Sequence, residues 1–69
     1  MTNETIDTAR DLLSILDGLI KSAADGAEDL RRKREQVWRT LDEAGVKRNQ
    51  IALWSNIGPM MVSRALKAE

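Results

Sequence analysis

The sequence predicts an all-α protein of four helices, in which a long N-terminal helix precedes a three-helix unit. Apolar residues recur at spacings of three and four along most of the chain. No stretch alternates apolar and polar residues as a half-buried strand does. Glycine and proline stand where the helical periodicity stops. With 69 residues, the chain is expected to form one compact domain.

The first helix is expected over residues 5–24, where two apolar stripes run side by side. The first stripe has a heptad-like spacing and consists of Ile6, Ala9, Leu13, Leu16, Ile20 and Ala23. The second stripe consists of Leu12, Ile15 and Leu19. Together they form an apolar face wider than one partner helix needs.

This wide face predicts a homodimer. A domain of roughly 60 residues buries only about 60% of its unfolded surface, so a second copy is a natural source of extra burial. The chain has no cysteine for a disulfide. The residues expected at the dimer contact are Ile6, Ala9, Leu12, Leu13, Leu16, Leu19 and Ile20.

The second helix is expected over residues 27–44. Asp25 and Glu28 have the spacing of a capping box at its start. Gly45 stands where a C′ glycine ends a helix. Trp38 lies on the apolar side of this helix, so we expect it in the core.

Four consecutive basic residues, 31–34, separate the apolar positions Leu30 and Val37 of the second helix. Four neighbours cannot share one helix face, so some of them must lie at the edges of the apolar stripe. The sequence leaves open whether this run has a role beyond solvation.

Two short helices are expected over residues 48–55 and 59–67, joined by a turn at residues 56–58. Pro59 suits the first position of a helix, because its fixed φ is helical and its missing N–H has no intrahelical partner there. The expected inward positions are Ile51, Ala52, Val62, Ala65 and Leu66. We expect Trp54 to pack against the N-terminal helix.

The composition argues against an enzyme. The chain has no histidine, cysteine or tyrosine, so a serine or threonine nucleophile would lack the usual imidazole base. A metal site would depend on carboxylates alone. We therefore expect no catalytic residue, no metal and no cofactor.

Membrane insertion and secretion are also not expected. No apolar stretch approaches the ~20 residues that a membrane span needs. The first ten residues carry acidic side chains and lack a basic start followed by an apolar stretch. A soluble, cytoplasmic protein is the expectation.

Charge is distributed unevenly although the formal net charge is zero. Residues 1–30 carry seven acidic and two basic residues, a net charge of −5. Residues 31–69 carry nine basic and four acidic residues, a net charge of +5. The split predicts an acidic segment joined to a basic one.

The segment over residues 35–67 resembles the helix-turn-helix of bacterial and phage DNA-binding regulators. The matching residues are Ala44-Gly45-Val46, Ile51-Ala52, Ile57, Val62-Ser63-Arg64 and Leu66. Two positions depart from the pattern. Asn56 replaces the turn glycine, and Lys47 replaces the serine or threonine that usually caps the first short helix.

The resemblance implies a sequence-specific protein for double-stranded DNA, in particular a small dimeric transcriptional repressor. Residues 1–26 would then serve dimerisation, and residues 27–69 would form the helix-turn-helix unit of the same compact domain. The implied DNA-binding residues are Arg48, Asn49, Gln50, Gly58, Pro59, Met60, Met61, Ser63, Arg64 and Lys67.

An alternative is a protein–protein interaction module that uses a degenerate helix-turn-helix to modulate another protein. The zero net charge, the wide apolar first helix and the pair Met60 and Met61 favour it. Neither interpretation involves a membrane, and no small-molecule ligand is evident from the sequence.

Overall fold

The computed structural model describes residues 3–23 and 25–67, which form four α-helices. They are α1 (Asn3–Ser22), α2 (Ala27–Glu43), α3 (Arg48–Ser55) and α4 (Pro59–Lys67). The described residues contain no strand, so the predicted all-α class with four helices is confirmed. The first helix is expected to end at position 24, which lies outside the described residues. The expected dimerisation segment, 1–26, begins at positions 1–2, and the expected helix-turn-helix unit, 27–69, ends at positions 68–69. These positions also lie outside the described residues.

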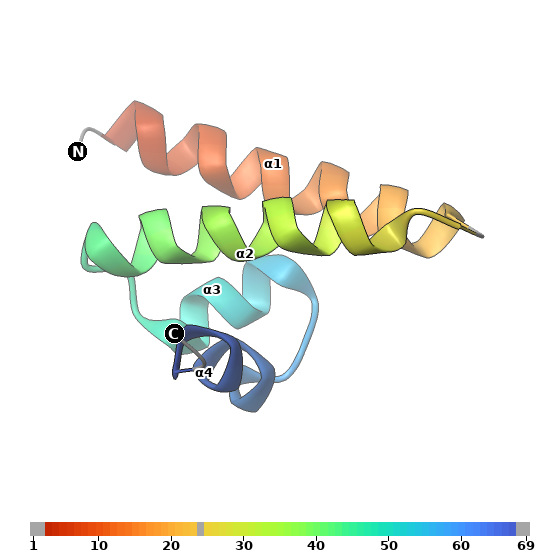
Figure 1. Cartoon of the computed structure of the whole chain (residues 1–69). Helices are drawn as coiled ribbons and strands as arrows, with labels where there is room; N and C mark the ends of the chain where they lie inside the picture. Colours follow the sequence, from red (N-terminus) through yellow and green to blue (C-terminus); the bar gives the residue numbers. More distant parts are fainter. Residues whose placement is uncertain (1–2, 24, 68–69) are drawn as a thin grey trace.

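The helices α1 and α2 form an antiparallel pair, and α3 and α4 pack on one side of it (Figure 1). Helix α2 contacts all three other helices, and α3 also contacts α1. The chain therefore forms one body rather than a separate N-terminal helix beside a three-helix unit.

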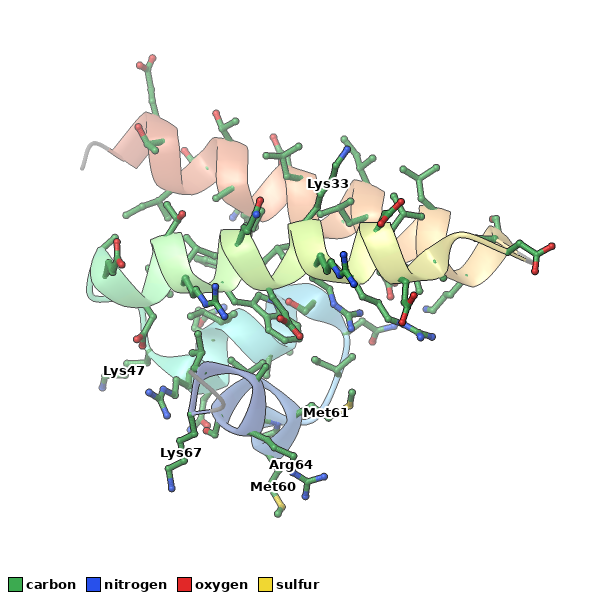
Figure 2. All side chains as sticks on the ribbon, in the orientation of Figure 1. Lys33, Lys47, Met60, Met61, Arg64 and Lys67 are labelled. Atoms are coloured by element: carbon green, nitrogen blue, oxygen red, sulfur yellow. The ribbon has the colours of Figure 1, made fainter. Side chains whose placement is uncertain are left out.

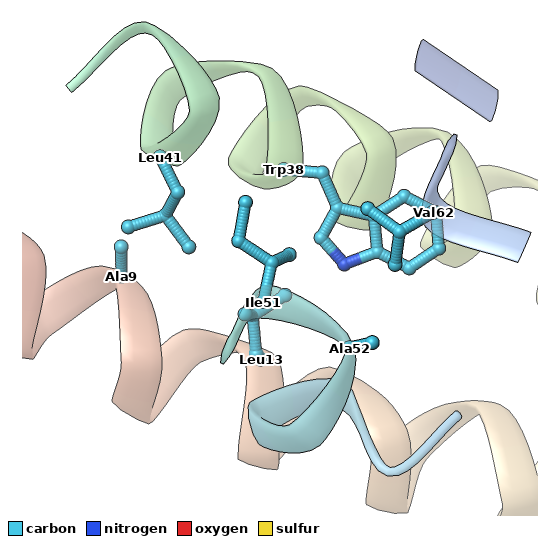
Figure 3. Close-up of a cluster of buried hydrophobic side chains, with 7 residues drawn as sticks. All are labelled: Ala9, Leu13, Trp38, Leu41, Ile51, Ala52 and Val62. Atoms are coloured by element: carbon cyan, nitrogen blue, oxygen red, sulfur yellow. The ribbon is translucent and has the colours of Figure 1, made fainter. Parts of the chain in front are cut away.

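All four helices contribute to a single hydrophobic core (Figure 3). Its buried members are Ala9, Leu13, Trp38, Leu41, Ile51, Ala52 and Val62. The first apolar stripe of α1 thus supplies core residues of the chain itself. The expected burial of Trp38, Ala52 and Val62 is confirmed, since none is more than 2% exposed.

A buried hydrogen-bond chain ties α2 to α3. The Trp38 Nε1–H donates to Ser55 Oγ at 2.8 Å, and the Ser55 hydroxyl donates to the Ile51 carbonyl oxygen at 2.8 Å. The indole N–H, which would be costly to bury alone, is satisfied. Sequence reasoning had assigned no role to Ser55.

The C-terminus of α2 ends as predicted. Gly45 has φ 91°, a left-handed conformation that suits a residue without a side chain. The N–H of Val46 donates to the Leu41 carbonyl at 3.0 Å, and the N–H of Gly45 donates to the Asp42 carbonyl at 3.0 Å. This pair of bonds is a Schellman motif.

The turn between α3 and α4 uses the same motif with asparagine in place of glycine. Asn56 has φ 58°, which its short polar side chain tolerates. The N–H of Ile57 donates to the Ala52 carbonyl at 3.1 Å. The substitution of the usual turn glycine therefore preserves the turn.

The predicted capping box of α2 is wrong. Gly26 is the N-cap residue, with φ 81°, and no side chain caps the helix. Asp25 precedes the cap by one residue, so its carboxylate does not have the capping position. Lys47 caps α3 without a side-chain hydrogen bond, as its departure from the motif implies.

The Ala52 side chain lies at the crossing of α3 and α4, where it is 1% exposed. Replacing it with leucine should overpack this crossing and lower the free energy of unfolding by roughly 1–3 kcal/mol. Chemical denaturation measures this change. An Ala52→Leu variant with the parent's midpoint would contradict the close crossing.

Removal of the Ser55 hydroxyl should leave the Trp38 N–H buried without an acceptor. We expect Ser55→Ala to lower the free energy of unfolding by about 1–3 kcal/mol. Ser14→Ala, at an exposed position of α1, is the matched control and should unfold like the parent. Equal denaturation midpoints for the two variants would show that the hydrogen bond is unimportant.

Candidate nucleic-acid interface

One face of α4 is anchored in the core and the opposite face is open to solvent. Val62 is fully buried and fixes the rotation of the helix. Five of the predicted DNA-binding residues share the outer face, around a shallow depression of about 370 Å³. They are Pro59, Met60, Ser63, Arg64 and Lys67. Figure 2 shows Met60, Arg64 and Lys67 pointing away from α1 and α2.

Met61 does not belong to this outer face, although the sequence analysis grouped it with Met60. It lies farther round α4, beside Ile57 and Ala65, where the helix adjoins α2. Successive residues of a helix are separated by about 100° around its axis, so neighbours face different surroundings. Gly58 is exposed directly before α4, and its carbonyl accepts the Met61 N–H at 3.1 Å.

The start of α3 offers fewer free polar groups to DNA than the sequence predicts. The Arg48 Nε lies 3.6 Å from Asp42 Oδ1 of α2, so this guanidinium already has an acidic neighbour. The N–H of Gln50 donates to the Lys47 carbonyl at 2.9 Å. The backbone N–H of Gln50 is therefore not free to bind a phosphate, whereas the side chain of Asn49 is exposed.

The charged residues of α3 and α4 are all basic. Residues 47–67 contain four basic residues and no acidic residue. Lys47, Arg64 and Lys67 project from the same end of the molecule, opposite Lys33 (Figure 2). This end has a local positive charge despite the zero net charge of the chain, and such a patch attracts phosphate groups.

The helical form of α4 suits a DNA groove. An α-helix with its side chains is about 10–12 Å in diameter, and the major groove of B-DNA is about 12 Å wide. A guanidinium such as that of Arg64 can donate two parallel hydrogen bonds to guanine, and the ammonium group of Lys67 suits a phosphate.

The residues predicted at the dimer contact divide into two groups. Ala9, Leu13 and Leu16 are buried, and Ile6 and Ile20 are half-buried. The chain's own packing covers them, because α2 and α3 lie against this side of α1. The three buried residues cannot meet a partner unless the fold opens, whereas Ile6 and Ile20 keep part of their surface exposed.

The second stripe of α1 remains uncovered. Leu12, Ile15 and Leu19 are 43%, 58% and 49% exposed. Thr5 and Thr8 continue the same 3–4 spacing toward the N-terminus. Beside this stripe, a groove of about 450 Å³ lies between α1 and α2. The apolar surface left for a dimer contact is therefore this second stripe, Leu12, Ile15 and Leu19, which is called the outer stripe below.

Trp54 packs as expected. It is half-buried against the core, and the Arg10 guanidinium of α1 lies 5.9 Å from the centre of its ring. This distance is within the range of a cation–π contact.

The buried position of Arg34 was missed by the sequence reasoning. It is only 8% exposed, and its guanidinium carbon lies 4.8 Å from the centre of the Trp38 ring. Burial lowers the pKa of Arg34, and the like charge of Arg31 adds to this effect. A signal was available, because Leu30, Arg34 and Trp38 share one side of a helix at i, i+4 spacing.

Two further findings concern the described part of the chain. None of its helices combines the length and apolarity that a membrane crossing needs. Its histidine, cysteine, aspartate and glutamate side chains form no cluster of three or more that could hold a metal ion.

Comparison with known proteins finds no relative. No protein-family model, no curated protein and no solved structure matches the chain.

Proposed function

We propose that this protein binds double-stranded DNA through α4 and acts as a small dimeric transcriptional repressor. The observation that carries the proposal is the exposed face of α4, with Ser63, Arg64 and Lys67 in a segment, residues 47–67, that has basic but no acidic side chains. No catalytic role is proposed, and the site of action is inferred to be the cytoplasm.

Each polar residue of this face has a separate role in the proposed complex. Arg64 donates to the acceptors on the major-groove edge of guanine, and Lys67 neutralises a phosphate. Ser63 adds one hydroxyl that donates or accepts. Met60, which is 74% exposed, offers apolar contact to a thymine methyl group.

The proposed dimer forms through the outer stripe of α1. Leu12, Ile15 and Leu19 present apolar surface at heptad spacing, as a helix does in a two-stranded coiled coil. A two-fold symmetric dimer binds two half-sites about one helical turn of DNA apart and doubles the number of phosphate contacts.

A second candidate function is the binding of another protein by the same end of the molecule. Leu53 and Met60 are 72% and 74% exposed, and large apolar side chains in the open favour a protein contact. This candidate predicts that apolar substitutions matter more than the removal of charge.

The DNA proposal is tested with Arg64→Ala and Lys67→Ala. Arg64→Ala should weaken binding to a selected DNA sequence by roughly 1–3 kcal/mol and relax the preference at one base pair. Lys67→Ala should weaken all duplexes about equally and lower the salt slope by about one unit. A salt-dependent gel shift, preceded by selection from random duplexes, measures both effects.

Arg32→Ala is the matched control, because the exposed Arg32 of α2 lies neither on the outer face of α4 nor at the groove beside the proposed dimer stripe. It should bind DNA like the parent. If neither α4 variant changes DNA binding while Met60→Ala abolishes capture of a protein partner, the second candidate replaces the first.

The dimer is tested by placing a charge in the outer stripe. Ile15→Glu should give a monomer in sedimentation at roughly tens of micromolar protein, where the parent is a dimer. Ser14→Glu introduces the same charge at the neighbouring exposed residue, off the stripe, and should remain dimeric. A monomeric parent at this concentration rules the dimer out.

A further inference from the structure

A hollow of about 410 Å³ lies where α2 meets the C-terminal part of α1 and the inner edge of α4. Its apolar walls include Ile20 of α1, Trp38 of α2, and Ile57 and Met61 at the α4 end. The volume is in the range of small-molecule sites, about 300–1,000 Å³. This hollow adjoins a different side of α4 from the proposed DNA face.

Two guanidinium groups line the same hollow. Arg31 is exposed at its edge, and Arg34 is buried within its wall. They belong to the basic run, residues 31–34, whose role beyond solvation the sequence leaves open. The fold places the four residues of this run on different surfaces. Lys33 lines the groove between α1 and α2, and the exposed Arg32 lines neither the groove nor the hollow.

Arg34 has an unmet hydrogen-bond requirement. Its Nε–H is buried and donates to no atom of the described residues. Neither Asp17, whose carboxylate lies 3.1 Å from the Lys21 Nζ, nor Glu35 forms an ion pair with it within the described residues. The Trp38 ring covers the face of the guanidinium, but a ring face does not satisfy the N–H groups at its edge.

Buried polar groups are nearly always hydrogen-bonded in folded proteins, and an exception calls for an explanation such as an absent partner. The Nε has no accessible surface, so an anion in the hollow would accept from the terminal N–H groups of the Arg34 guanidinium instead. It would also offset the repulsion between Arg34 and Arg31. Both effects that lower the pKa of Arg34, desolvation and the charge of Arg31, favour such an anion.

The charges that line the hollow select the anion. Arg31 and Arg34 carry two positive charges and Glu35, which also lines the hollow, carries one negative charge. The carboxylate of Asp17 also acts on Arg34, but the charge of Lys21 beside it balances that carboxylate, so one positive charge remains. A singly charged group therefore balances the site, whereas a doubly charged phosphate would leave excess negative charge between apolar walls. A guanidinium pairs well with a carboxylate, and the walls accept an apolar body.

We propose that this hollow binds a small monocarboxylate with an apolar body, its carboxylate on Arg31 and Arg34 and its body against Trp38, Ile57 and Met61. The ligand touches the indole ring, so the tryptophan signals can report on it. The site does not depend on DNA binding, and its test requires no DNA.

The test follows the two indole N–H signals of the full chain by ¹⁵N NMR, with a Trp54→Phe variant to assign the Trp38 signal. Hexanoate is the probe, 1-hexanol has a similar body without charge, and acetate has the charge with almost no body. Hexanoate should shift the Trp38 signal saturably, with a Kd of about 1 mM or lower. Hexanol and acetate should bind more weakly.

Variants localise the site. Arg34→Met keeps an unbranched buried side chain and should weaken hexanoate about tenfold or more, because a charge-assisted hydrogen bond is lost. Arg31→Gln, at an exposed position that does not threaten folding, should weaken hexanoate about two- to fivefold. Arg32→Gln, which removes the same charge from the neighbouring exposed residue, is the matched control and should bind like the parent.

Several results would overturn the proposal. They are an unsaturable or absent shift with hexanoate, equal affinity for hexanoate and hexanol, and unchanged hexanoate affinity in both Arg34→Met and Arg31→Gln. Inorganic phosphate that binds as tightly as hexanoate would overturn the assignment to a monocarboxylate. Because none of these measurements uses DNA, their failure leaves the DNA proposal untouched.

Discussion

The burial of the Trp38 indole is the interaction on which the rest of the structure depends. Trp38 is the largest side chain of the core and is only 2% exposed. Its N–H bonds to Ser55 at the end of α3, its ring supports the Arg34 guanidinium, and Val62 of α4 belongs to the same cluster. A single side chain of α2 thus fixes α3, orients α4 and forms a wall of the hollow proposed as a ligand site.

Helix α1 shows how a short chain divides its apolar surface between folding and association. Its inner stripe completes the core, with Leu13 fully buried. Its outer stripe repeats the same 3–4 spacing one position away, yet no element of the chain covers Ile15 or Leu19. A chain of this length has too few helices to cover both stripes, which is the physical basis for proposing a second copy.

The charges are segregated in space as well as along the sequence. The acidic residues of α1 lie on the hairpin, whereas α3 and α4 carry only basic charges at the other end (Figure 2). A zero net charge therefore does not describe what a phosphate backbone would meet on approaching α4. The basic run of α2 does not lie wholly on the surface, since Arg34 is buried against Trp38.

The helices and most of their ends can be predicted from the sequence, because they depend on neighbouring residues. The 3–4 apolar spacing set the rotation of each helix, and Gly45, Asn56 and Pro59 marked the turns through their local backbone preferences. The local pattern predicted the wrong N-cap of α2, because Asp25 lies one residue before the position from which a side chain could cap the helix.

Which helix face packs against which neighbour depends on the arrangement of all four helices. Both stripes of α1 contain large apolar residues, and α2 and α3 pack against the inner one. The positions of α2 and α4 likewise placed Met61 and Arg34 in one hollow and left Met60 and Arg64 on the outer face. Periodicity specifies directions around a single helix axis, but burial depends on where the other helices lie, and residues distant in the sequence set that.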